Sequence, residues 1–339
     1  MFEHNFLDYF GLLSNKMTER DYPIDIVYLW CDDTDKQWQT KKQQYLSNEK
    51  HLDSQSTSDC RFANNDELKY SLRSVAKYAP WINHIYIVSD HQTPSWLNTD
   101  HPKITMINHE DILPKENLPL FNSCAIETGV AKIIPLSEHF LLANDDTFLG
   151  AFVHPKDFFN SQGQAIVYLK PNPAKKKIAK SQYSQFISQM QNTIFKAFGK
   201  RFNWQPHHNI DAYLKSEYQK CINHFHELSA TTIKHRFRKA PCFHRSLIGY
   251  YMICRQKAVQ HNIKKWRFKL LKLFPLLKHF IQVDSVSFNT SALKNIKKIS
   301  SISPKMFCLN DCEKTTAKDR QQLKQFMQEL FPTKSEFEK

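Results

Sequence analysis

The first half of the chain alternates between short apolar runs and segments with helical spacing. A continuous apolar run predicts a strand buried on both faces, and residues 24–30 form such a run. Further strands are predicted at 84–90, 104–112, 139–144 and 165–170. Between them, apolar residues recur at helical spacing in 65–81 and 125–133, which predicts two helices. Pro80 is expected to end the first of them. Strands alternating with helices predict an α/β fold with a mostly parallel central sheet.

After residue 171 the pattern becomes helical, basic and rich in histidine, as in 207–215 and 235–245. An amphipathic helix is predicted over 319–331. We therefore expect three parts: an α/β core over 1–170 that begins with a short helical lead-in over 1–22, a basic and mainly helical region over 171–300, and a C-terminal part over 301–339 that packs back on the core.

Polar side chains follow three of the predicted strands. They are Asp32–Asp35, Ser89–Asp90 and Asn144–Asp146. Parallel sheets bind ligands beyond the carboxyl ends of their strands, so these side chains are expected to face an active site. Adjacent carboxylates such as Asp145 and Asp146 repel each other, and a Mg²⁺ or Mn²⁺ ion that holds a diphosphate would offset the repulsion. The alternative is an ordinary helix cap or turn.

The start of the helix over 65–81 carries a group of polar and charged side chains: Arg61, Asn65, Glu67, Lys69 and Arg73. A helix N-terminus with nearby bases suits an anion. A solvated helix stabilised by Glu–Lys pairs is the alternative.

His244 lies beside Arg238, Lys239 and Arg245. A neutral histidine can take a proton from an attacking hydroxyl, which makes His244 a candidate base. The chain has 16 histidines, so this position alone does not single it out.

The net charge of +14 conceals a division along the chain. Residues 1–160 carry 14 Lys and Arg against 23 Asp and Glu, whereas residues 161–283 carry 23 against 3. The acidic part can hold a cation. The basic part can face phosphates, acidic glycans, nucleic acid or an anionic membrane, or it can be a solvated surface.

Several classes of site are disfavoured by the composition. Six glycines and no GxGxxG or GxxxxGK[ST] motif argue against a glycine-rich phosphate loop. Eight scattered cysteines without a CxxC pair predict free thiols rather than a zinc site. We expect no signal peptide and no membrane span, hence a cytoplasmic protein. Segment 264–280 mixes bases with Trp, Phe and Leu, which suits either an amphipathic helix packed on the core or a peripheral membrane contact.

Four segments together resemble the Stealth family of sugar-1-phosphate transferases: 24–35, 61–98, 121–150 and 304–311. The resemblance is dense over 24–160 and thin elsewhere. It implies a fold of the Rossmann-like, nucleotide-sugar transferase type, with donor and metal binding in 1–170, acceptor binding and a catalytic histidine in 171–300, and the fourth motif in 301–339.

The resemblance also implies a reaction. An NDP-hexose donor, usually UDP-linked, and Mg²⁺ or Mn²⁺ are expected. Hexose-1-phosphate would pass to a hydroxyl of an oligo- or polysaccharide, forming a phosphodiester in bacterial capsular or surface polysaccharide and releasing a nucleoside monophosphate. Contact with the inner face of the membrane or with capsule assembly machinery would accompany this role.

Site residues follow from the same resemblance, position by position. His244, Asp145 and Arg73 are expected to be catalytic, and Asn144, Asp145 and Asp146 to hold the metal. Substrate binding is expected from Asp32, Asp35, Arg61, Asn65, Glu67, Ser71, Asn122, Glu127, Arg238 and Arg245.

This sequence departs from the family pattern at several positions. Cys124 replaces a customary histidine, and Gly129 and Lys132 stand where the family usually has histidine and another basic or polar residue. A later arginine has no counterpart in 283–293.

Two other functions remain open from the sequence. An ordinary metal-dependent glycosyltransferase would share the nucleotide-sugar site but release a nucleoside diphosphate. A nucleic-acid-binding protein would use the basic segment 161–283, with steeply salt-dependent binding. It would leave the acidic strand ends unexplained, and no RRM, KH or zinc-finger signature supports it, so no nucleic-acid partner is expected.

Overall fold

The computed structural model describes residues 22–47, 54–172, 182–274, 276–277, 281–291, 296 and 298–339. Residues 1–21 of the expected helical lead-in lie outside the described residues. In the part of the chain that is described, no helix is both long enough and apolar enough to cross a membrane.

The central sheet has five strands in the order β3-β2-β1-β4-β8. Four are parallel to one another: β1 (Ile24–Leu29), β2 (Ile85–Ser89), β3 (Ile104–Asn108) and β4 (His139–Asn144). The edge strand β8 (Asp211–Leu214) is antiparallel to β4. The prediction of a mostly parallel α/β sheet is therefore confirmed, and four of the five predicted strands lie in it.

The direction of β8 decides what lies at the carboxyl edge of this sheet. Asn144 ends β4 opposite Leu29 of β1, and Asp211 begins β8 opposite Leu142. Because β8 runs backwards, the residues just before it lie at the same edge as the residues just after β1 and β4.

The fifth predicted strand forms but does not join the central sheet. It is β6 (Ala165–Pro171), which pairs with β7 (Trp204–Pro206) and β9 (Ala258–Asn262). A third sheet contains β10 (Ser285–Asn289), β11 (Met306–Asn310) and β5 (Thr147–Leu149). The periodicity of 165–170 identified a buried strand, but its partners come from more than thirty positions away and periodicity does not specify them.

Helix α4 (Glu67–Tyr78) matches the helix predicted over 65–81. It buries Leu68, Leu72 and Val75 in the core and ends two residues before Pro80. The single helix predicted over 125–133 is wrong in its extent.

That segment instead forms α6 (Ser123–Glu127) and a 3₁₀ turn over Val130–Lys132. Gly129 lies between them, and a Cβ there would meet the carbonyl oxygen of Ile112 at 2.8 Å. This close approach of two backbones divides the segment.

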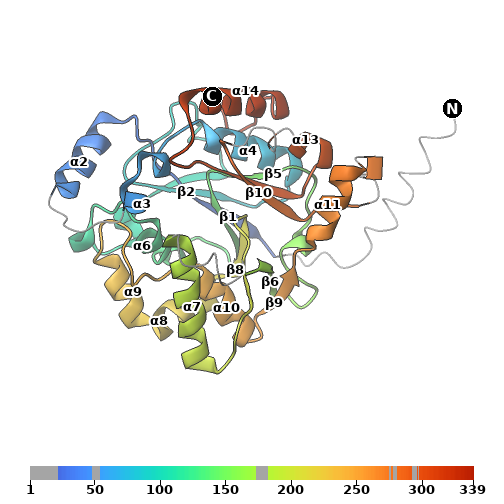
Figure 1. Ribbon diagram of the computed structural model, residues 1–339. Helices are drawn as coiled ribbons and strands as arrows, with labels where there is room; N and C mark the ends of the chain where they lie inside the picture. The colour runs from blue at the N-terminus through green and yellow to red at the C-terminus, as the bar shows by residue number, and fades with distance from the viewer. Residues whose placement is uncertain are drawn as a thin grey trace, which may run out of the picture.

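The remaining helices surround the three sheets: α2 (Lys36–Leu46), α3 (Ser54–Thr57), α5 (His109–Ile112), α7 (Gln182–Phe198), α8 (Lys215–His224), α9 (His226–Ile233), α10 (Ser246–Cys254), α11 (Lys265–Leu273), α13 (Lys298–Ile302) and α14 (Ala317–Leu330). Figure 1 shows α7–α10 gathered below the central sheet and α4 and α14 above it. The region 171–300 is thus helical as expected, but it also contributes β7, β8, β9 and β10 to the sheets.

Segment 264–280 forms α11 in part, with residues 275 and 278–280 outside the described residues. Leu271 is fully buried, as an amphipathic helix packed on the core requires. Nearby, four large apolar side chains are exposed: Trp266, Leu273, Phe274 and Leu276.

Candidate active site

The turn Asn144–Asp146 joins two strands of different sheets, β4 and β5. Within it, the carboxylate of Asp145 accepts a hydrogen bond from the Asp146 N–H at 3.1 Å. The Thr147 hydroxyl donates to the Asn144 carbonyl at 2.6 Å. Both aspartates are therefore held in place at the carboxyl edge of the central sheet.

Three carboxylates converge at this turn: Asp145, Asp146 and Glu67, the first residue of α4. Burial raises the pKa of Glu67 to about 7, with the charge of Asp146 adding to the effect. Burial, and then the charges of Glu67 and Asp146, raise the pKa of Asp145 well above its ordinary value. Mutual repulsion in a poorly solvated place is what a bound cation would relieve.

Glu67 is positioned by Asn65, another predicted site residue. The Asn65 backbone N–H donates to one oxygen of the Glu67 carboxylate at 2.5 Å, and its side-chain amide donates to the other at 2.6 Å. Both residues lie at the helix start as expected, but they bind each other.

Asp146 meets two residues that the sequence did not single out, His208 and Cys308. Its Oδ1 atom is buried without a hydrogen-bond partner and lies 3.8 Å from His208 Nε2. Its Oδ2 atom accepts from the Cys308 thiol at 3.4 Å. One ligand atom from each of the three residues lies within 4.8 Å of the others.

The chemistry of the ligand atoms decides which kind of cation these residues suit. Burial and the charge of Asp146 raise the pKa of Cys308, so the thiol stays protonated and donates to Asp146. Mg²⁺ and Mn²⁺ prefer carboxylate oxygens, whereas a set with thiolate and imidazole suits a softer ion. The unpartnered oxygen of Asp146, with Asp145 beside it, fits the hard cation.

Arg245 is buried and contacts the turn from the side of the basic region. Its Nη1 donates to Asn144 Oδ1 at 3.0 Å and lies 3.8 Å from Glu127 Oε1, and its Nε lies 3.3 Å from Asp211 Oδ2. Asn144, expected as a metal ligand, therefore has its oxygen engaged by Arg245. Two carboxylates balance the charge of Arg245, which suits a positioning role.

Glu127 and Asp211 carry buried carboxylates on either side of Arg245. Burial raises the pKa of both, that of Asp211 to about 6, and Arg245 opposes the rise. Glu127 Oε2 is buried without a hydrogen-bond partner. Glu127 thus reaches the site as predicted, with one oxygen not hydrogen-bonded within the described residues.

The other predicted residues near α6 stabilise its attachment. Asn122 caps α6 by accepting from the Cys124 N–H at 3.2 Å, and its amide donates to the His235 carbonyl at 3.0 Å. Arg238 donates to the Ser123 hydroxyl. These contacts hold the loop that carries His244 against the carboxyl edge of the sheet.

The positions that depart from the family pattern lie on the same stretch. Cys124 is buried with Phe186 and Cys242. Gly129 has no room for a side chain, as described above, and Lys132 is exposed. Within the described residues, neither Cys124 nor Lys132 hydrogen-bonds the carboxylate cluster of Asp145, Asp146 and Glu67.

His244 is neutral at pH 7, because burial and then the charges of Arg245, Arg238 and His208 lower its pKa well below its ordinary value. Its Nδ1 accepts from the Ser246 N–H at 3.2 Å and lies 2.9 Å from the Ser246 hydroxyl. This pattern assigns the ring proton to Nε2. The nitrogen that could take a proton is therefore already engaged.

His208 is one of the residues that sequence reasoning missed. Its Nε2 lies 3.4 Å from the Asn144 amide nitrogen and faces Asp146 Oδ1. It lies three residues before the start of β8. The sequence showed a histidine pair at 207–208, but only the antiparallel pairing of β8 places it at the site.

Asp32 and Asp35, at the end of β1, take part in local turns. Asp35 caps α2 by accepting from the N–H groups of Gln37 and Trp38, which together with Gln92 lowers its pKa. Asp32 accepts from the N–H and hydroxyl of Thr34 at 3.0 and 2.8 Å. Their substrate-binding role stays a prediction.

Asp33, between them, has a different setting. Its carboxylate accepts from the Asn64 N–H at 3.2 Å, and burial raises its pKa. Asp33 and Asp145 both raise the pKa of Cys31, after the larger effect of burial, which places Asp33 near the carboxylate cluster. Arg61, predicted to bind substrate, donates to Gln182 at 3.3 Å on the same side of the molecule.

Arg73 and Ser71, on α4, contact other parts of the protein. Arg73 donates through Nε and Nη2 to the two oxygens of Glu338, at 2.8 and 2.7 Å, and through Nη1 to the Phe331 carbonyl at 2.7 Å. Ser71 donates to the Thr147 carbonyl at 2.6 Å and so supports the turn from behind. Among the described residues no contact joins Arg73 to the cluster, and its catalytic role stays a prediction.

Helix α14 places two cations at the rim of the site. Arg320 donates through Nε to Asp311 Oδ2 at 2.9 Å, and its charge lowers the pKa of Asp33 against the larger effect of burial. Lys324 Nζ lies 2.6 Å from Asp66 Oδ2, next to Glu67. Neither was expected, because α14 lies some 250 positions after Glu67 and reaches it only in three dimensions.

Residues 61–167 match the model of a known family, Stealth protein CR2, conserved region 2. The chain is 31% identical over 298 residues to the capsular polysaccharide phosphotransferase LcbA of Neisseria meningitidis, covering 86% of this chain and 78% of that protein. It is 30% identical over 307 residues to the capsular polysaccharide phosphotransferase fcs1 of Haemophilus influenzae, covering 88% and 81%.

A third relative covers almost the whole of both chains. The exopolysaccharide phosphotransferase cps2G of Lactiplantibacillus plantarum is 30% identical over 355 residues, covering 95% of this chain and 98% of that protein. Among solved structures, the galactosyltransferase LgtC in complex with donor and acceptor sugar analogues has a TM-score of 0.45 and 10% identity, covering 91% of this chain and 96% of that chain. With these sequence relatives and the matched conserved region, the chain belongs to the Stealth family.

Proposed function

We propose that this protein transfers hexose-1-phosphate from a UDP-hexose donor to a hydroxyl of a capsular or surface polysaccharide. Its relatives are named as capsular and exopolysaccharide phosphotransferases. The observation that carries the proposal is the carboxylate cluster of half-buried Asp145 and Asp146 with buried Glu67 at the carboxyl edge of the sheet, where a parallel α/β fold binds its ligand.

Asp145 and Asp146 would hold Mg²⁺ or Mn²⁺. A cation bound there would neutralise part of the charge of the donor diphosphate. Glu67, held by Asn65, would be the third carboxylate facing it. Asn144 would act through Arg245 rather than as a ligand.

Arg320 and Lys324 would supply the positive charge that a diphosphate needs on its other side. Within the described residues Arg320 hydrogen-bonds Asp311 through Nε alone, so its two Nη groups can donate to phosphate oxygens. Arg320 would thereby take the place of the family's later arginine, which has no counterpart in the sequence of 283–293.

In the reaction, the acceptor oxygen attacks the phosphorus that carries the hexose. A new P–O bond forms, the P–O bond to the nucleoside monophosphate breaks, and the hydroxyl proton passes to a base. Such transfer depends mainly on positioning and charge.

His244 was the base expected from the sequence, and His208 is the second candidate. His208 Nε2 lies 3.8 Å from Asp146 Oδ1 and accepts one long hydrogen bond, at 3.4 Å, from the Asn144 amide. His244 Nδ1 is held more tightly, by the Ser246 N–H at 3.2 Å and the Ser246 hydroxyl at 2.9 Å. We therefore propose His208 as the base and His244 as a residue that positions the loop leading into Arg245.

The three parts of the chain would share this work. Residues 1–170 would bind donor and metal, 171–300 would add His208, Arg245 and acceptor contacts, and 301–339 would add Cys308 and Arg320.

We further propose that α11 contacts the inner face of an anionic membrane. Trp266, Leu273, Phe274 and Leu276 are exposed next to basic residues of the same segment, a combination that suits lipid headgroups.

The nucleotide released from the donor tests the reaction. The purified protein is incubated with a panel of NDP-hexoses, Mg²⁺ and oligosaccharide acceptors, with Asp145→Asn as control. Release of a nucleoside monophosphate, with phosphorus retained in the glycan and loss in the variant, is expected. Release of a nucleoside diphosphate would instead identify an ordinary glycosyltransferase.

A further inference from the structure

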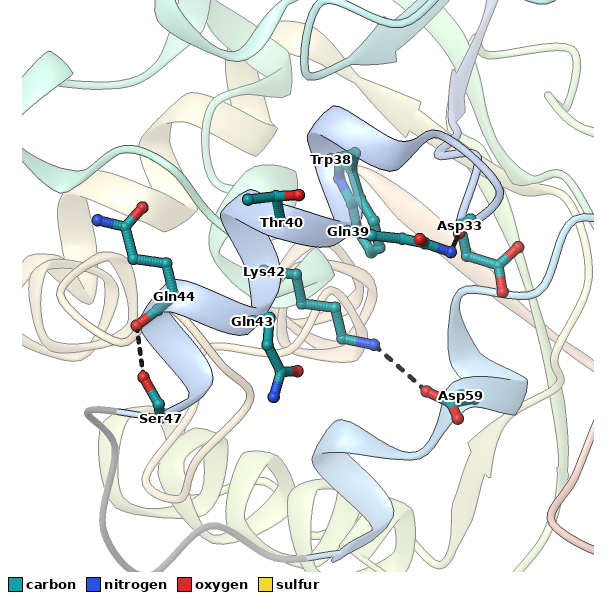
Figure 2. A pocket seen from close by; sticks show the side chains of 9 residues that line it. All are labelled: Asp33, Trp38, Gln39, Thr40, Lys42, Gln43, Gln44, Ser47 and Asp59. Atoms are coloured by element: carbon teal, nitrogen blue, oxygen red, sulfur yellow. Dashed lines mark hydrogen bonds and ion pairs between the residues drawn. The ribbon is translucent and has the colours of Figure 1, made fainter.

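A polar groove lies along α2, on the side of the loop that follows β1. Its volume is about 830 Å³, within the range of small-molecule sites. Figure 2 shows α2 running across it, with Asp33 at one end and Asp59 facing Lys42. The lining residues are Asp33, Trp38, Gln39, Thr40, Lys42, Gln43, Gln44, Ser47 and Asp59.

The groove is rich in side chains that both donate and accept hydrogen bonds. Gln43 and Gln44 are exposed, with amides that can serve sugar hydroxyls in either direction. Gln39 donates to the Asp33 carbonyl at 2.6 Å and closes the end beside β1. Amides and hydroxyls in such number favour an uncharged, hydroxyl-rich ligand over a purely apolar one.

Lys42 is the exception, because it is a charged residue that is only 9% exposed. Its ammonium lies 4.0 Å above the ring centroid of Phe62 and 3.6 Å from Asp59 Oδ1, a separation too long for a hydrogen bond. The side chain of Asp59 is 96% exposed, so water weakens this ion pair. Within the described residues no hydrogen bond reaches this ammonium, and burying it in that state is unfavourable unless an anion binds it.

The groove adjoins the carboxylate cluster through Asp33. Asp33 accepts from the Asn64 N–H, and the next residue, Asn65, holds Glu67. The charges of Asp33 and Asp145 both act on Cys31. A ligand in the groove would therefore have one end near the place where the proposed transfer occurs.

We infer that this groove binds the acceptor glycan, with Lys42 taking a phosphodiester and Gln43 and Gln44 the sugar hydroxyls beside it. This inference rests on the proposed function, whose product carries one phosphodiester per transferred unit. An acceptor with at least one earlier phosphodiester presents that group to Lys42. The carboxylates of Asp33 and Asp59 at the two sides disfavour a denser polyanion.

The test compares two acceptors with the full-length protein. One is an oligosaccharide with its hexoses joined by phosphodiesters, and the other has the same hexoses joined by glycosidic bonds. Steady-state kinetics with Lys42→Met, Gln43→Glu and wild type give separate KM values for donor and acceptor. Lys36→Met is the matched control, because Lys36 is an exposed lysine of α2 outside the groove.

We expect Lys42→Met to raise the acceptor KM about tenfold for the phosphodiester glycan only, the size typical of losing a charge-assisted hydrogen bond. Gln43→Glu, an exposed substitution that leaves the fold intact, should act in the same direction by repelling the phosphate. In Lys42→Met and Gln43→Glu the donor KM should stay within about twofold of the wild-type value. In Lys36→Met the KM values for donor and for both acceptors should stay within that range.

An acceptor KM that is unchanged, or that rises equally for both glycans, would overturn the inference. Failure of the wild type to release a nucleoside monophosphate with any donor would instead count against the proposed function. Release that proceeds normally, with acceptor kinetics indifferent to Lys42 and Gln43, would count against the groove alone.

Discussion

The thiol of Cys308 lies 3.4 Å from Asp146 Oδ2, although the two residues are 162 positions apart. The contact exists because β11 pairs with β5 and places Cys308 opposite Thr147, next to the turn. Burial keeps the thiol protonated, so it donates to Asp146 instead of competing with it for a cation. This relationship favours a hard cation over a soft one at the proposed metal site.

Cys308→Ser should therefore retain Mn²⁺ binding, because a hydroxyl can donate to Asp146 as the thiol does. We expect the Mn²⁺ dissociation constant, followed by electron paramagnetic resonance, to change by less than about threefold, well under the effect of losing a ligand. Asp146→Asn should weaken it about a hundredfold. Loss of Mn²⁺ binding in Cys308→Ser would identify the thiolate as a ligand.

Arg73→Met should destabilise the protein, because it leaves the buried carboxylate of Glu338 without its partner. Breaking such a pair lowers the free energy of unfolding by about 3 kcal/mol. Combined with Glu338→Gln, the loss should be much less than additive, measured by urea unfolding. Lys77→Met, an exposed change on the same helix, is the control. A loss of kcat without a loss of stability would restore the catalytic role predicted for Arg73.

The same pair has a defined pH dependence. Burial alone would raise the pKa of Glu338, but hydrogen bonds from Arg73 and Ser335 lower it below its ordinary value of 4.5. A carboxyl with a lowered folded-state pKa adds stability above its unfolded pKa, and loses it as pH falls through the folded value. The stability difference between wild type and Glu338→Gln should therefore be complete at pH 7 and shrink below pH 4.5. A constant difference down to acid unfolding would contradict this.

His208→Gln should reduce kcat more than His244→Gln does. Removing a general base lowers kcat by about 10²- to 10⁴-fold. His244→Gln removes the contact with Ser246 and displaces the loop that carries it, so kcat should fall less and KM should also rise. The comparison is made by steady-state kinetics, with the exposed His91→Gln as control. The reverse order would return the base to His244, as the sequence first indicated.

Arg320→Gln should raise the KM for the nucleotide sugar about tenfold, because a diphosphate loses a charge-assisted partner. Arg320→Lys should recover part of this loss. Lys318→Gln removes an exposed charge from the same helix and should change nothing. An unaltered donor KM in Arg320→Gln would show that the arginine only anchors Asp311.

Replacing Trp266 and Phe274 by alanine should abolish sedimentation with vesicles that contain anionic lipid, since both side chains are exposed in the segment proposed to enter the headgroup region. Nucleotide release in the absence of vesicles should remain. Phe152→Ala, a change at an exposed aromatic residue outside segment 264–280, is the control. Binding that persists in the double variant would place the membrane contact elsewhere.

Local patterns of the sequence determined the parallel strands, helix α4 and the position of Asn144–Asp146 at the carboxyl edge. Apolar runs and helical spacing depend on neighbours within a few residues. In a parallel sheet the carboxyl ends of all strands lie at the same edge, so a residue that follows a strand is placed at that edge. The Stealth resemblance, carried by the same residues, was confirmed by the matched region and the relatives.

Tertiary structure alone decided which of those side chains have distant partners. His208 reaches the turn because β8 runs antiparallel. Arg320 is held by Asp311, from where its charge acts on Asp33, and Arg73 pairs with Glu338 near the end of the chain. Hydrogen bonds and ion pairs across hundreds of positions depend on how strands pair and helices pack, and periodicity carries no record of that pairing.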